Sequence, residues 1–259
     1  MSSNLVALVT GASRGIGKSI ALHLALRGVR IALHYRNNRQ AAEAALADLP
    51  GAGHSLCDAD LVDPAAATQL WQRVTRQFGA VDILINNAGI YLMHPPLVTD
   101  YATWQSAWRD TLATNLTAPA NLSLLAAQSM ASRPGPVNVD FGRGRIVNIS
   151  SRGAFRGEPD APAYGASKAG LNALSQCLAK SLAPNAIYVY CVAPGWVATE
   201  MAESHLSGPD GPSILAQHPL GRVNRTDEIA AATVYCALDA PPAMTGGVID
   251  VNGASYLRT

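Results

Sequence analysis

The chain has 259 residues, 49% of them hydrophobic, and a formal net charge of +1 at pH 7. This length suits one large α/β domain, and we expect residues 1–259 to fold as a single unit around a sizeable core. The near-zero net charge argues against a nucleic-acid-binding protein, because neutralising phosphates requires a basic surface.

Three features bear on where the protein works. The start, MSSNLVALVT, lacks the basic region and the long apolar run of a secretory signal. The longest uncharged stretch, residues 111–132, contains Asn, Gln and Pro, so we interpret it as a buried or interface helix and not as a membrane span. The cysteines show no metal-binding spacing. We therefore expect reduced core thiols, no metal site and a cytoplasmic protein.

Short apolar runs alternate with helix-like segments along the chain. The strand candidates are residues 5–10, 29–35, 54–57, 81–86, 145–149, 187–192 and 247–251. Segments between them, such as 39–49 and 64–78, are rich in Ala, Leu, Gln and Arg. Because the runs are apolar on both faces, the pattern predicts a three-layer, doubly wound α/β fold with one parallel sheet of about seven strands and helices on both faces.

Two stretches break this alternation. Residues 132–144 (SRPGPVNVDFGRG) are a Pro- and Gly-rich loop before a strand candidate. Residues 196–219 are a long irregular connection that contains SGPDGPS. Long loops in compact domains are often binding elements, so we expect 196–219 to form a lid over a substrate.

A Gly-rich turn, TGASRGIG at residues 10–17, follows the first strand candidate and opens a helical segment. Glycine at positions 11, 15 and 17 allows a tight turn and a close approach of the backbone to a ligand. The helix N-terminus offers free N–H groups and the positive end of a dipole to a pyrophosphate. The pattern predicts a dinucleotide site formed by Gly11, Ser13, Arg14, Gly15, Ile16 and Gly17.

The spacing T-G-x-x-x-G-x-G resembles that of the classical short-chain dehydrogenase/reductase family, and further family motifs follow in order across essentially the whole chain. An N-N-A-G element ends the fourth strand candidate, and a Y-x-x-x-K motif begins at Tyr164, thirteen residues after Ser151. The resemblance implies an NAD(P)-binding Rossmann domain. It also implies cofactor contacts at Asn87, Ala88, Gly89, Tyr164, Lys168, Pro194, Gly195, Val197 and Thr199.

The chemistry of carbonyl reduction assigns a role to Tyr164. The carbonyl oxygen needs a proton, and a phenol with a pKa of about 10 is a poor donor near neutral pH unless a nearby cation lowers that pKa. Lys168 lies four residues on, so both side chains share one helix face. We assign Tyr164 as general acid in reduction and general base in oxidation, tuned by Lys168, with Ser151 bonded to the substrate oxygen. A Tyr–Lys pair on a solvated helix face is the alternative.

The resemblance adds Asn115 as a fourth catalytic residue, which in the family holds a water that passes protons to the lysine. Pro119 lies four residues on and has no N–H, so the Asn115 carbonyl loses its usual helical partner. We predict that this carbonyl binds the water. A simple proline kink in a packing helix is the alternative.

The end of the second strand candidate indicates the cofactor. Family members that use NAD commonly carry an acid here, whereas this chain has Tyr35 followed by Arg36 and Asn37. Arg14 is a second cation nearby, and two guanidinium forks match the geometry of one phosphate. We therefore expect NADP(H) to be favoured over NAD(H). Weaker candidates for this pocket are Arg39, and Asp60 and Leu61 beside the adenine by family position.

Within the family the chain is most similar to 3-oxoacyl-[acyl-carrier-protein] reductases. The similarity rests on the strings TGASRGIG, VAPGWVATEM and GRVNRTDEIA. The expected reaction is NADPH-dependent reduction of a 3-oxoacyl thioester or related ketone, with hydride from nicotinamide C4 and the proton from Tyr164. The expected assembly is a homotetramer, and an acyl carrier protein is a candidate carrier of the substrate. The cleft is expected to include Tyr91, Met93, Arg152, Phe155 and Trp196.

Several alternatives stay open. The arginines at 152 and 156 could meet a carrier protein, hold an anionic substrate, or pair with Glu158 and Asp160. An NAD-linked alcohol, sugar or steroid dehydrogenase and a pteridine-type reductase, the latter suggested by the string LHYRN, are alternative enzymes. An NADP(H)-sensing binding protein is the alternative without catalysis. Cofactor preference and turnover separate these functions.

Overall fold

The computed structural model describes residues 5–258, and within them one sheet carries seven strands in the order β3-β2-β1-β4-β5-β6-β7. All neighbouring strands pair in parallel. The strands are β1 (Val6–Val9), β2 (Arg30–Tyr35), β3 (Ser55–Asp58), β4 (Ile83–Asn86), β5 (Gly144–Ile149), β6 (Ile187–Pro194) and β7 (Val248–Val251). The predicted seven strands and the doubly wound Rossmann-type α/β fold are confirmed.

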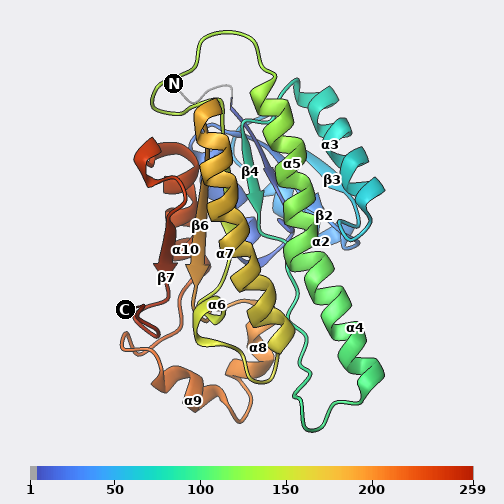
Figure 1. Cartoon of the computed structure of the whole chain (residues 1–259), viewed down its shortest axis with the longest axis vertical. Helices are drawn as coiled ribbons and strands as arrows, with labels where there is room; N and C mark the ends of the chain where they lie inside the picture. Colours follow the sequence, from blue (N-terminus) through green and yellow to red (C-terminus); the bar gives the residue numbers. More distant parts are fainter. Residues whose placement is uncertain (1–4, 259) are drawn as a thin grey trace.

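Helices cover both faces of the sheet. Helices α3, α5 and α7 lie in front of the sheet in Figure 1, and α1, α2 and α10 pack on the opposite face. The longer helices are α1 (Gly15–Leu26), α2 (Arg39–Ala47), α3 (Pro64–Phe78), α4 (Tyr101–Leu112), α5 (Ala118–Ala131), α7 (Pro162–Leu182) and α10 (Thr226–Val234). The short ones are α6 (Gly153–Arg156), α8 (Glu200–Leu206) and α9 (Gly211–Ala216). Short 3₁₀ or π segments are Ala113–Thr117, Ala183–Asn185, Tyr235–Asp239 and Pro242–Met244.

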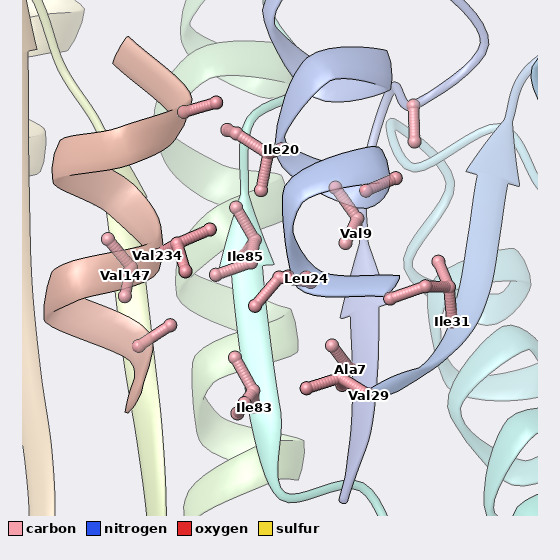
Figure 2. Packing of buried hydrophobic residues seen from close by; sticks show 14 of the residues in the cluster. Ala7, Val9, Ile20, Leu24, Val29, Ile31, Ile83, Ile85, Val147 and Val234 are labelled. Atoms are coloured by element: carbon pink, nitrogen blue, oxygen red, sulfur yellow. The ribbon is translucent and has the colours of Figure 1, made fainter. Parts of the chain in front are cut away.

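Each central strand buries both of its faces, which explains its unbroken apolar sequence. In β1, Ala7 and Val9 join one core while Val6 and Leu8 join the other. Figure 2 shows the first core, where side chains of the central strands meet Ile20 of α1. Burying one large aliphatic side chain contributes about 1.5–3 kcal/mol, so these two cores hold the strand ends at fixed positions.

The uncharged stretch 111–132 is the second half of a longer helical run. Helix α4 begins ten residues earlier, where the Asp100 carboxylate accepts a hydrogen bond from the Thr103 N–H at 2.9 Å. A π-helical turn at Ala113–Thr117 joins α4 to α5, and the two helices run in line in Figure 1. The first half of this helical run contains the charged residues Arg109 and Asp110, so it was not part of the uncharged stretch.

The connection 196–219, predicted to be irregular, contains the two short helices α8 and α9 (Figure 1). Residues 132–143 form a loop, as predicted, and Gly144, expected to end that loop, is the first residue of β5. Among the described helices, none combines the length and the apolar character needed to cross a membrane. All four cysteines are free, and three of them are buried as predicted, but Cys177 is exposed and is not the core thiol that we expected.

Candidate active site

A cavity of about 580 Å³ opens along the carboxyl ends of the central strands. Its walls come from the Gly-rich turn after β1, the end of β2, the segment after β4, and the segments after β5 and β6. Ligands of doubly wound sheets bind at this edge, where the strand order reverses direction. The volume falls within the range of small-molecule sites.

The Gly-rich turn between β1 and α1 has the geometry that its glycines predict. Gly11 and Gly15 adopt φ values of +63° and +55°, in the left-handed region that disfavours other residues. A side chain at position 17 would collide with the Gly11 carbonyl oxygen. The N-cap of α1, Arg14, makes no side-chain capping bond, so the N–H groups at the start of this helix remain available to an anion.

Three side chains hold this turn in place, and two of them, Thr10 and His34, were not predicted as site residues. Thr10 Oγ1 accepts hydrogen bonds from the N–H groups of Asn87 and Ala88 at 2.9 and 3.0 Å. The Asn87 side chain donates to the Thr10 carbonyl at 2.9 Å. The Nδ1 atom of His34 accepts from the Gly11 N–H at 3.1 Å. Burial lowers the pKa of His34 to about 4, so the ring stays neutral and keeps this acceptor.

The predicted phosphate clamp consists of two separate ion pairs in this structure. Arg36 lies 2.8 Å from Asp60, and Arg14 lies 2.9 Å from Glu200. Both pairs are well exposed, and exposed pairs are worth only about 0–1 kcal/mol, so a bound phosphate can compete for either arginine. Arg39 pairs with Glu43 on α2 at 2.8 Å, as a solvated helix start would. Residues Tyr35, Asn37 and Leu61 line the cavity beside Arg36.

The predicted catalytic side chains meet at the inner end of the cavity. Ser151, Tyr164 and Lys168 all line it, and Lys168 Nζ lies 5.7 Å from the centre of the Tyr164 ring. Lys168 is buried and its Nζ donates to the Ile149 carbonyl at 2.8 Å. Pro194, Gly195, Val197 and Thr199 line the wall that follows β6. The structure therefore brings together groups that are far apart in the sequence.

The electrostatics differ from the predicted tuning of Tyr164 by Lys168. Burial raises the pKa of Tyr164 to about 12, and a hydrogen bond from Ser151 lowers it only in part. Burial also lowers the pKa of Lys168 to about 8. Desolvation of the Tyr164 phenol raises its pKa more than the nearby ammonium of Lys168 lowers it, because that ammonium is turned toward the Ile149 carbonyl. Tyr164 is thus a protonated donor at neutral pH, not a phenolate.

Asn115 is fully buried behind these groups, within the π-helical turn. Its side chain accepts from the Ile90 N–H and donates to the Ile90 carbonyl, both at 2.9 Å, and also donates to Ser167 Oγ at 3.2 Å. A π turn is a common irregularity at functional sites. The amide thereby fixes the segment after Gly89 beside Lys168, while the water bound to the Asn115 carbonyl stays a prediction.

The substrate end of the cavity is aromatic and polar. The Tyr91 ring packs edge-on against Tyr164 with centroids 4.9 Å apart, and His205 of α8 contacts both Tyr91 and Trp196. Glu158, which the sequence reasoning did not place in the site, also lines the cavity. Two predicted wall residues are not among those that line the cavity. Met93 is 53% exposed, and the Phe155 ring stacks beneath the Arg258 guanidinium.

The two arginines after Ser151 converge on one amide. Arg152 and Arg156 both donate to Gln217 Oε1, at 2.9 and 2.8 Å, just beyond the end of α9. Among the described residues, neither lies within ion-pair distance of Glu158 or Asp160. The contacts instead fasten the base of the α8–α9 segment to the loop that carries Ser151.

Comparisons with known proteins agree with this geometry. The family model for short chain dehydrogenase matches residues 5–209. The chain is 36% identical over 256 residues to the 3-oxoacyl-[acyl-carrier-protein] reductase FabG of Escherichia coli K12, covering 97% of each. It is 34% identical to the enzyme of the same name from Staphylococcus aureus Mu50, covering 97% of this chain and 98% of the relative.

A solved structure provisionally described as a gluconate dehydrogenase of Agrobacterium tumefaciens superimposes with a TM-score of 0.88 at 26% identity. The match covers 98% of this chain and 96% of that one. The names of these relatives give different substrates. The chain belongs to the short-chain dehydrogenase family.

Proposed function

We propose that the protein reduces a carbonyl to an alcohol with NADPH, and that Ser151, Tyr164, Lys168 and Asn115 carry the chemistry. One observation carries this proposal. The phenol of Tyr164, the hydroxyl of Ser151 and the ammonium of Lys168 line the same cavity as the Gly-rich turn. A nicotinamide cofactor held by that turn would supply the hydride that reduces the carbonyl carbon.

The roles of the side chains follow from their protonation. Tyr164, with a pKa raised to about 12, holds a proton at neutral pH and donates it to the carbonyl oxygen as negative charge develops there. Ser151, whose Oγ accepts from the Gly153 N–H at 3.0 Å, turns its own hydrogen toward the substrate oxygen or Tyr164. Lys168, with a pKa of about 8, is mostly protonated at pH 7 and favours the phenolate left after the transfer.

The preference for NADPH rests on the end of β2. Tyr35 occupies the position where an acid would repel a 2′-phosphate, and Arg36 follows it at the cavity wall. Arg14 lines the same end of the cavity. Each guanidinium is held by an exposed carboxylate, and a phosphate with about two negative charges is a stronger partner than one carboxylate.

A 3-oxoacyl thioester or a related ketone is the proposed substrate class, supported by two relatives of that name. An acyl carrier protein would have to meet Arg156, because Arg152 is only 3% exposed. A homotetramer is the proposed assembly, and Leu124, 55% exposed on the sparsely charged α5, suits a buried interface. A cytoplasmic protein remains our expectation.

An assay of the wild-type protein tests the proposal. NADPH and NADH oxidation would be followed by absorbance with acetoacetyl-CoA and with simple and hydroxylated ketones. We expect turnover of at least one carbonyl, at a higher kcat/KM for NADPH than for NADH. Tight NADPH binding without turnover across the panel would instead support a sensing protein. Faster turnover with NADH would support an NAD-linked dehydrogenase.

A further inference from the structure

We infer that Glu158 makes the enzyme specific for a carbonyl or alcohol that bears neighbouring hydroxyl groups, in preference to a plain acyl chain. This inference rests on the proposed reduction with NADPH, and of the two proposed substrates it selects the related ketone, with hydroxyl groups, over the 3-oxoacyl thioester. It starts from a carboxylate that the catalytic mechanism does not use. Glu158 lies in the loop between α6 and α7, six residues before Tyr164, and lines the cavity beside it.

The Glu158 carboxylate is held within the site. Gly153 makes room for it, because a Cβ at that position would lie 2.5 Å from Glu158 Oε1 and 2.8 Å from its Cγ. A Cβ at Gly165 of α7 would lie 3.4 Å from the Glu158 N atom, an ordinary van der Waals distance, so α7 packs directly against the same loop. The close fit against Gly153 of α6 therefore limits where the Glu158 side chain lies.

The carboxylate has free hydrogen-bonding capacity. Among the described residues, no hydrogen bond or ion pair is made to its oxygens, and Arg152 and Arg156 act on it only through their charge. Burial raises the pKa of Glu158, as expected for a carboxylate shielded from water without a direct partner. A partly buried acceptor of this kind is satisfied by a donor that the ligand brings.

The surroundings favour hydroxyl groups as that donor. A plain acyl chain offers no hydrogen-bond donor and would leave the carboxylate desolvated and unpaired. A cationic substrate would meet the charges of Arg152 and Arg156, which are close enough to act on Glu158. Tyr91 adds a second polar group, since burial and the charge of Glu158 raise the pKa of its phenol and keep its hydrogen in place. Neutral hydroxyl groups suit both side chains.

Oxidation of matched alcohols tests the inference without relying on the open-chain form of a sugar. The substrates are erythritol, xylitol and sorbitol, each against the 2-alkanol of equal carbon number, with NADP⁺ and NAD⁺. Acetoacetyl-CoA reduction is measured in parallel. We expect at least one polyol to exceed its 2-alkanol by about 100-fold in kcat/KM, because a site built to bond a hydroxyl rejects the analogue without it.

Variants separate the role of Glu158 from general damage. Glu158→Leu and Glu158→Gln should lower polyol kcat/KM by roughly 10- to 100-fold and leave the 2-alkanol value unchanged or raised. Asp160→Asn removes a carboxylate two residues away, whose backbone carbonyl bonds His94, and should leave both values unchanged. Cofactor binding, measured by fluorescence titration, should be unchanged in all three variants.

The outcomes are distinct. Preference of the wild type for 2-alkanols or acetoacetyl-CoA, or an equal loss on both substrate classes in the Glu158 variants, overturns the inference and leaves the proposed reductase in place. Absence of turnover with every alcohol and carbonyl tested overturns the proposed function, and the inference with it.

Discussion

The two halves of the cavity are built in different ways. The cofactor half is made from backbone, with the glycines of the first turn, the start of α1 and the braces from Thr10 and Asn87. The substrate half is made from side chains of two loops and helix α8, chiefly Tyr91, Glu158 and His205. A backbone site accepts one ligand geometry, whereas a side-chain site can change its ligand through single substitutions. We therefore infer that the first half fixes how the cofactor is held and that the second half sets the substrate.

The largest effect expected on cofactor binding comes from a methyl group added to the backbone half. Gly17→Ala places a Cβ against the Gly11 carbonyl oxygen, so the turn must shift. We expect a loss of cofactor affinity of about 100-fold or more and a destabilisation of about 1–3 kcal/mol. Fluorescence titration and chemical denaturation measure the two effects.

Gly135→Ala is the matched control, because Gly135 also has a positive φ, +96°, but an added Cβ meets nothing within 4 Å. It should lose some stability and no cofactor affinity. Unchanged affinity in Gly17→Ala would show that the turn does not hold the cofactor.

A smaller effect is expected at the rim of the same half. Arg36→Ala should weaken NADPH binding about tenfold and change NADH binding little, since only NADPH offers the 2′-phosphate. The control is Arg39→Ala, because Arg39 pairs with Glu43 on the helix surface. An equal loss for both cofactors, or the same loss in the control, would contradict the proposed NADPH preference.

The pH dependence changes no side chain and distinguishes Lys168 from Tyr164. Burial lowers the pKa of Lys168 to about 8, so its positive charge is present below pH 8 and lost above it. We expect kcat/KM for NADPH, at saturating ketone, to be level to about pH 8 and to fall up to tenfold per unit above it. Tyr164, with a pKa of about 12, cannot cause this decline. A decline that starts only above pH 10 would show that Lys168 keeps its charge.

The same comparison explains how much could be predicted from the sequence. The strands were predictable because two-sided burial leaves continuous apolar runs, as in β1. The cofactor turn was predictable because positive φ values and close backbone approach require glycine at fixed spacing. Residue types that the backbone geometry requires can therefore be recognised from the local sequence.

The substrate half was predicted only in part. Tyr91, Arg152 and Trp196, expected in the cleft from their places after sequence motifs, line the cavity, whereas Glu158 and His205 were missed. In the sequence, Glu158 has no feature that distinguishes it from other acidic loop residues. Only the fold places it against Gly153 and beside Tyr164. The short helices α8 and α9 were missed because the Gly- and Pro-rich string SGPDGPS runs from the end of α8 into α9 and because tertiary contacts hold the segment, such as the bonds to Gln217 just after α9. The pKa of Tyr164 was predicted in the wrong direction, because burial cannot be read from a Tyr–Lys spacing. Long-range packing decides each of these features.

The most direct test of the account separates proton transfer from cofactor binding in Tyr164→Phe. This change removes the phenolic oxygen and keeps the ring that packs against Tyr91. We predict that kcat falls by about 10³-fold or more while the dissociation constant for NADPH changes less than about threefold. Retention of substantial turnover, or a loss explained by weaker NADPH binding alone, would contradict the role of Tyr164 as the proton donor.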